Sequence, residues 1–161
     1  MNGSLASHIT EVLAGPRFAG RTSALRCSGG FEGPVDYAVA VPVKDEAELL
    51  PRALYALLAA MHYSPARGGL VFVVNHTTDA SAAIIRDILQ KASVVFAIVE
   101  ISFDPEIRDA PHARRLALDI GWRYAPDGVL LTTDADSYVG PNWITSRWSY
   151  IAGGYDLVCE D

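Results

Sequence analysis

Short, continuously apolar runs alternate with longer amphipathic stretches over most of the chain. From Val35 onward, five runs predict strands, namely "YAVAVPV" (37–43), "LVFVV" (70–74), "VVFAIVEI" (94–101), "GVLLTT" (128–133) and "YDLVC" (155–159). Their apolar, β-branched character is typical of strands that are buried on both faces of a sheet.

Helical periodicity appears between these runs. We expect helices within "KDEAELLPRALYALLAAM" (44–61), "AAIIRDILQKA" (82–92), "HARRLALDIGWRYA" (112–125) and "GPNWITSRWSYIAG" (140–153). In the first of them, leucines recur at helical spacing, acids fill the first turn, where they suit the helix dipole, and Pro51 fits the same turn. The alternation of strand and helix predicts an α/β, Rossmann-like fold: a mostly parallel sheet with helices on both faces and right-handed crossovers.

Residues 1–34 differ from the rest, because Gly, Arg and Ser dominate and no period is sustained. We expect a loosely ordered arm or surface cover there, with one short helix in "ASHITEVLAG" that Ser7 caps and Gly15 ends. Residues 35–161 then form the main domain.

Charge and composition narrow the function. The chain has 161 residues and a formal net charge of −6, with no long basic run, which argues against a nucleic-acid partner. No run approaches the roughly 18 apolar residues of a transmembrane segment, and the start lacks a secretory layout. Cys27 and Cys159, far apart in sequence, are expected to be free thiols of a cytoplasmic protein.

Polar residues follow three of the predicted strands: "KDE" (44–46), "NHTTD" (75–79) and "DAD" (134–136). In open parallel sheets the ligand crevice lies at the carboxyl ends of the strands, so these segments are expected to line one site. In an extended backbone Asp134 and Asp136 would point to one side, roughly 6.6 Å apart. Two such carboxylates repel each other, and a hard divalent cation, Mg²⁺ or Mn²⁺, would relieve the repulsion. The alternative is a turn with two solvated acids.

Three ordered segments, "VAVPVKDEAELLPRALYALLA", "VFVVNHTTDASAAIIRDIL" and "ARRLALDIGWRYAPDGVLLTTDADSYVGPNWI", give the chain a family resemblance. Over roughly residues 37–159 it resembles the nucleotide-sugar-binding half of a family 2 glycosyltransferase with the GT-A fold. The resemblance implies transfer of a sugar, with inversion, from a nucleotide-diphosphate donor to an acceptor hydroxyl, assisted by a divalent metal.

The resemblance also implies roles for single residues. The nucleotide-sugar site would comprise Pro42, Val43, Lys44, Glu46, Asn75, Arg114, Asp134 and Ala135, and the metal ligands would be Asp134 and Asp136. Asn75 stands where the family usually has a base-binding aspartate, and Arg114 falls where an arginine approaches the diphosphate. Tyr138 would border the donor sugar or fill a turn.

No general base is identified, since the family's base and acceptor site follow the Asp-x-Asp segment by more residues than this chain has. We therefore expect a domain that stops before the acceptor region. Two alternatives stay open: a non-catalytic nucleotide-sugar-binding or interaction module, and an Asp-x-Asp phosphohydrolase. An uncovered sheet edge would favour a homo-oligomer.

Overall fold

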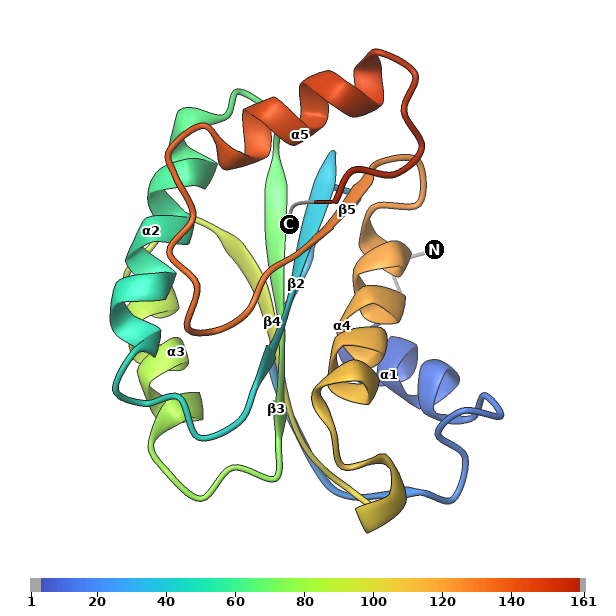
Figure 1. The fold of residues 1–161 in the computed structure, drawn as a ribbon. Coiled ribbons are helices and arrows are strands. Elements are labelled where there is room, and N and C mark those ends of the chain that lie inside the picture. Colours follow the sequence, from blue (N-terminus) through green and yellow to red (C-terminus); the bar gives the residue numbers. More distant parts are fainter. Residues whose placement is uncertain (1–3, 160–161) are drawn as a thin grey trace.

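The computed structural model describes residues 4–159 and has a five-stranded sheet at its centre (Figure 1). The strands are β1 (Thr22–Gly30), β2 (Tyr37–Val43), β3 (Gly68–Asn75), β4 (Val95–Phe103) and β5 (Val129–Thr132), in the spatial order β1-β4-β3-β2-β5. Strands β2 to β5 are parallel, and only β1 runs antiparallel, against β4. The predicted α/β fold with a mostly parallel sheet is confirmed.

Helices cover both faces of this sheet. They are α1 (Leu5–Leu13), α2 (Leu50–Tyr63), α3 (Ser81–Gln90), α4 (Ala110–Tyr124) and α5 (Trp143–Ala152), with a short 3₁₀ turn, η1 (Pro105–Ile107). Helices α2 and α3 lie on one face and α4 on the other, with α1 beside α4 (Figure 1). In the described residues, no helix is both long enough and apolar enough to cross a membrane.

Two hydrophobic clusters hold the layers together, one on each face of the sheet. Along β2, Val39 and Val41 belong to the cluster under α2 and α3, whereas Ala38 and Ala40 belong to the cluster under α4. All seven residues of β2 are buried, which explains why this strand is apolar without a break instead of alternating with polar residues.

The acids expected in the first turn of α2 lie before it. The helix begins at Leu50, so Asp45, Glu46 and Glu48 belong to the loop that follows β2. Pro51 does lie in the first turn, as predicted, where its missing N–H is tolerated. Three carboxylates that were expected in the helix thus belong to the loop that follows β2 at the carboxyl edge of the sheet.

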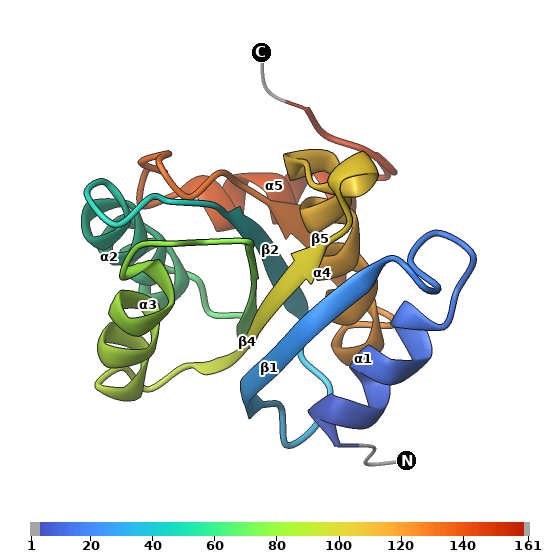
Figure 2. The ribbon, with the colours of Figure 1, turned by 90° about the horizontal axis from the view of Figure 1, so that it is seen from below.

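Residues 1–34 were expected to form a loosely ordered arm or a surface cover, and the structure describes regular elements within residues 4–34 of this region. It contains α1, which Ser4 rather than Ser7 caps, and the edge strand β1, which lies along β4 (Figure 2). Most residues of β1 are exposed or only partly buried. The strand is therefore held by backbone pairing rather than by an apolar face, and its residues show no periodic signal.

The predicted C-terminal strand over 155–159 is wrong, because those residues form neither strand nor helix. Leu157 is 77% exposed, so the apolar letters there do not mark a core element. Within the described residues β5 pairs only with β2. Self-association through its free edge stays a prediction.

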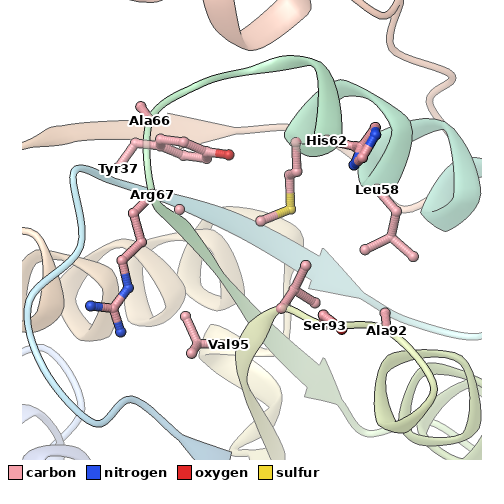
Figure 3. Close-up of a pocket in the computed structure, with 11 residues that line it drawn as sticks. Tyr37, Leu58, His62, Ala66, Arg67, Ala92, Ser93 and Val95 are labelled. Carbon is pink, nitrogen blue, oxygen red and sulfur yellow. The ribbon is translucent and has the colours of Figure 1, made fainter.

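At the amino ends of the strands, a pocket of about 380 Å³ lies beside Tyr37 (Figure 3). Tyr37 is fully buried, and its ring packs so closely on Gly68 that an added Cβ there would lie 2.0 Å from the ring. The hydroxyl makes no hydrogen bond of ordinary geometry. Burial, with the charge of Asp36 nearby, raises the pKa of Tyr37 to about 12, and the Ser64 side chain offsets only part of the rise.

Tyr37→Phe tests this burial through the pH dependence of stability. A raised pKa in the folded state means that the contribution of the neutral phenol is complete below about pH 10 and is lost as the pH rises toward 12. At neutral pH the variant should differ from wild type by less than about 1 kcal/mol, since no hydrogen bond is lost. Between pH 10 and 12, the free energy of unfolding of wild type should fall by on the order of 2–3 kcal/mol relative to that of the variant.

Urea unfolding across this pH range measures the difference, with Tyr55→Phe as the control because Tyr55 is 61% exposed. Stability curves for wild type and Tyr37→Phe that stay parallel up to pH 12 would show that Tyr37 ionises normally in the folded protein.

Candidate functional site

Two loops meet at the carboxyl edge of the sheet, and hydrogen bonds join them. The loop after β2 and the loop after β3 both lie at the lower end of the sheet in Figure 1. The Thr78 N–H donates to the Asp45 carboxylate at 2.8 Å, and the Glu46 N–H donates to the Ser81 hydroxyl at 3.0 Å. Asp45 thus joins the two loops. These bonds fix the relative position of the polar segments that were predicted to share a site.

Asp79 is the strongest of these connections. Its carboxylate accepts from the Ser81 N–H at 2.9 Å, from the Ser81 hydroxyl at 2.6 Å and from the Ala47 N–H at 3.0 Å. The hydroxyl bond, followed by these backbone bonds, lowers the pKa of Asp79, and slight burial opposes the shift. Asp79 is not the N-cap of α3, which is Ala80 and makes no side-chain capping bond; its carboxylate instead joins Ser81 to the loop after β2, and Thr78 bonds across to Asp45.

The Asp-x-Asp segment forms a turn, not the extended backbone that the sequence suggested. The Ser137 N–H donates to the Asp134 carbonyl oxygen at 3.2 Å, directly after β5 ends. Ala135 is 4% exposed and packs into the core, whereas Asp134 and Asp136 are both exposed. The buried alanine therefore anchors the turn and leaves the two carboxylates at its surface.

Arg114 connects this turn to α4. A guanidinium nitrogen, Nη2, donates to Asp134 Oδ1 in a close ion pair. The first turn of α4 is fixed by Asp109, whose carboxylate accepts from the His112 N–H at 2.8 Å and contacts His112 Nδ1 at 2.6 Å. His112 thus belongs to the helix cap. Arg115 bonds to Asp119 on its own helix at 2.8 Å, away from the turn.

Two buried polar atoms on the α4 side of the site have no partner among the described residues: Asn75 Oδ1 and Arg114 Nε. Asn75 is 2% exposed and follows Val73 by two residues, so it lies on the face of β3 that α4 covers. One atom is a hydrogen-bond acceptor and the other a donor. Buried polar groups are nearly always paired, and these two atoms keep an acceptor and a donor that a ligand or water can use.

Negative charge gathers around Glu46. Partial burial raises the pKa of Glu46 first, and the charges of Asp136, Asp79, Asp134 and Asp45 raise it further. Such an edge of the sheet favours a cation. The part of the chain that the structure describes contains no group of three His, Cys, Asp or Glu side chains already arranged around a metal.

Two carboxylates are nevertheless enough for Mg²⁺ or Mn²⁺ when phosphate oxygens and water complete the shell. Asp134 and Asp136 supply exposed oxygen ligands of the right chemistry, although Arg114 contacts one of them. The residues present therefore fit a metal that is shared with a phosphorylated ligand.

The other predicted site residues differ in what they can offer. Pro42 and Val43 are buried, so Val43 can meet a ligand only through its backbone, while Lys44 is exposed. His76 is exposed, has a left-handed backbone (φ 48°) and lines a neighbouring pocket of about 300 Å³. Trp143 and Trp148 are partly buried and pack against the core.

The sequence analysis missed one contact beside the aspartates. The Arg52 guanidinium lies 4.3 Å from the ring centre of Tyr138, which is 44% exposed. This cation–π contact ties α2 to the segment after the Asp-x-Asp turn. No local pattern links an arginine to a tyrosine 86 positions later, so only the fold reveals the pair.

A mostly parallel sheet with helices on both faces and polar loops at its carboxyl edge defines an open α/β class of protein. Within that class, residues 38–160 match the family model described as glycosyl transferase family 2. The chain belongs to this family. No curated protein sequence matches the chain.

Solved structures share the fold at low sequence identity. S. aureus TarS 1-349 in complex with UDP matches with a TM-score of 0.57 and 18% identity, over 73% of this chain and 32% of that one. The mannosyltransferase PcManGT from Pyrobaculum calidifontis, in complex with GDP-Man and Mn²⁺, matches with a TM-score of 0.54 and 17% identity, over 92% of this chain. The chain spans about a third of the length of TarS 1-349 and 41% of PcManGT.

Asp79→Ala should loosen the two loops. The change removes the acceptor of three hydrogen bonds, so we expect a loss of about 1–3 kcal/mol at neutral pH. Because the pKa of Asp79 is lowered in the folded state, its contribution is present above about pH 4 and is lost as the pH falls through that lowered pKa.

Urea unfolding between pH 3 and pH 7 should therefore show a difference in the free energy of unfolding between wild type and Asp79→Ala, and this difference should become smaller as the pH falls. Asp87→Ala serves as the control, since Asp87 forms an exposed pair with Lys91 and should cost less than about 1 kcal/mol. An equal loss in both variants would contradict the anchoring role of Asp79.

Proposed function

We propose that this chain binds a nucleotide-diphosphate sugar through a divalent metal at Asp134 and Asp136, and serves its transfer to an acceptor hydroxyl with inversion. The observation that carries the proposal is the convergence of the aspartate turn, Arg114 and the unpartnered Asn75 oxygen at one edge of the sheet. Support comes from two proteins of the same fold, TarS with UDP and PcManGT with GDP-Man and Mn²⁺.

Each part of the donor has a complementary group. The buried Asn75 oxygen accepts a hydrogen bond from the base. The base and ribose lie beside the end of β2 (Pro42 and Val43), the loop that follows it (Lys44 and Glu46) and the turn at Ala135. The Arg114 guanidinium pairs with the diphosphate, whose charge suits a planar, permanently charged donor. Mg²⁺ or Mn²⁺, when bound, neutralises charge that develops on the leaving diphosphate.

The hydrogen bonds between the two loops prepare this arrangement before the donor arrives. Asp45, Asp79 and Ser81 hold the backbone of residues 45–47 against the start of α3. Bonds within the protein that hold these loops together reduce the entropy cost of positioning a donor.

Inversion by direct displacement also requires a general base near the acceptor hydroxyl. No residue of the site is assigned that role. A donor-binding module without transfer is therefore the second candidate function.

Calorimetric titration with UDP, GDP and their sugar conjugates, with and without Mn²⁺, tests the donor site. We expect metal-dependent binding by wild type and a loss of at least about tenfold in affinity for Asp136→Ala, because even outer-shell changes at metal sites cost 10–100-fold. Asp127→Ala is the matched control, since Asp127 is an exposed acid in the turn before β5, at the amino end of that strand.

Failure of folded wild type to bind any of these nucleotides with Mn²⁺ or Mg²⁺ would refute the donor site. Where binding is found, release of free UDP or GDP from the sugar conjugate separates the two candidates. Turnover that Asp136→Ala abolishes supports the transferase, and tight binding with no turnover supports the binding module. Phosphate release that is indifferent to nucleotide sugars would instead indicate a phosphohydrolase.

A further inference from the structure

Arg114 pairs with the same carboxylate that a metal would use. Its Nη2 donates to Asp134 Oδ1, while Asp136 has no ion pair or hydrogen bond to any other described residue. One member of the aspartate pair is therefore neutralised by the protein itself and the other is not. A metal that bridges the two must compete with the guanidinium for Asp134.

The guanidinium is also only partly satisfied. It has five N–H donors, and its buried Nε has no acceptor among the described residues. The side chain is 33% exposed and that of Asp134 is 58% exposed, so this pair is within reach of a ligand. A diphosphate offers more acceptor oxygens in a bidentate geometry than one carboxylate oxygen does.

The charges at this edge of the sheet make the binding of a metal and the binding of a diphosphate depend on each other. The charges of Asp134 and Asp136 act on Glu46, as do those of Asp45 and Asp79, and this negative charge repels a diphosphate that arrives without a metal. Arg114 in turn repels a metal that arrives without a diphosphate.

We propose that Arg114 is an exchangeable counter-ion: it holds Asp134 in the empty site and transfers to the diphosphate when metal and donor bind. This inference rests on the proposed function and adds a mechanism of coupling to it. Arg114 then acts as a positioning residue for Asp134 and a binding residue for the donor. Because coupling between two ligands is reciprocal, each should tighten the binding of the other.

The adjacent Arg115 provides a matched control. It lies on the same helix, carries the same charge and is 51% exposed, but it pairs with Asp119 at 2.8 Å instead of reaching the turn. Arg114→Gln and Arg115→Gln change the net charge equally, so a difference between them reports position rather than overall charge.

Electron paramagnetic resonance of free Mn²⁺ measures metal affinity directly, without any need for turnover. In the absence of nucleotide, Arg114→Gln should bind Mn²⁺ about two- to fivefold more tightly than wild type, since the competing ion pair is gone. With Mn²⁺ present, its affinity for UDP or GDP should be about tenfold weaker, because a charge-assisted phosphate contact is lost. Arg114→Lys, which keeps the charge but not the planar fork, should lie between.

The test is that Arg114→Gln should raise the affinity for Mn²⁺ and lower the affinity for UDP or GDP. A variant that merely misfolds would lose both affinities. Arg115→Gln should match wild type in both measurements. Tighter Mn²⁺ binding by Arg115→Gln as well, or unchanged Mn²⁺ affinity in Arg114→Gln, would overturn the exchange while leaving the donor site intact. Absence of Mn²⁺-dependent nucleotide binding in wild type would overturn the proposed function and this inference together.

Discussion

The parallel pairing of β2 with β3 and with β5 is the constraint on which the site depends. Parallel strands end at the same edge of a sheet, so the loop after β2, the loop after β3 and the turn after β5 meet although they are far apart in sequence. That alignment requires strands buried on both faces, which is why β2 has no exposed residue. The hydrophobic core thus determines where the acids gather.

Gathering acids at one edge has an electrostatic cost, and the structure offsets it in two different ways. Asp45 and Asp79 accept hydrogen bonds from Thr78, Ser81 and Ala47, which join the loops, and the bonds to Asp79 stabilise its charged form. Asp134 is satisfied by the Arg114 guanidinium. Asp136 has neither kind of partner among the described residues. The acids near α3 are therefore structural, while the aspartate turn retains unsatisfied charge, as a site for a cation requires.

Much of this arrangement could be predicted from the sequence, because strands β2 to β5 and helices α2 to α5 carry strong apolar patterns. Strand β1 was not predicted, because backbone pairing with β4 rather than burial holds it. The segment "YDLVC" was wrongly predicted as a strand, because an apolar run does not form a strand unless another strand pairs with it. The polar loops were placed correctly by the rule for parallel sheets. Their internal contacts were not predicted: the turn at Asp134, the bonds between Asp45 and Thr78, and the cation–π contact of Arg52 with Tyr138 depend on side-chain positions that no local pattern encodes.

Donor binding and sugar transfer make separate demands on such a fold. Every group invoked for the donor lies at the carboxyl ends of β2 and β3, on the segments that follow β2 and β5, or near the start of α4, and the two hydrophobic clusters hold these elements. A general base must instead face the acceptor, which these elements do not define. The pairing of Arg114 with Asp134 belongs wholly to the donor side, so its exchange can be measured whether or not the chain completes a transfer. The proposed metal and nucleotide binding can thus be tested apart from turnover, which also needs a base that faces the acceptor.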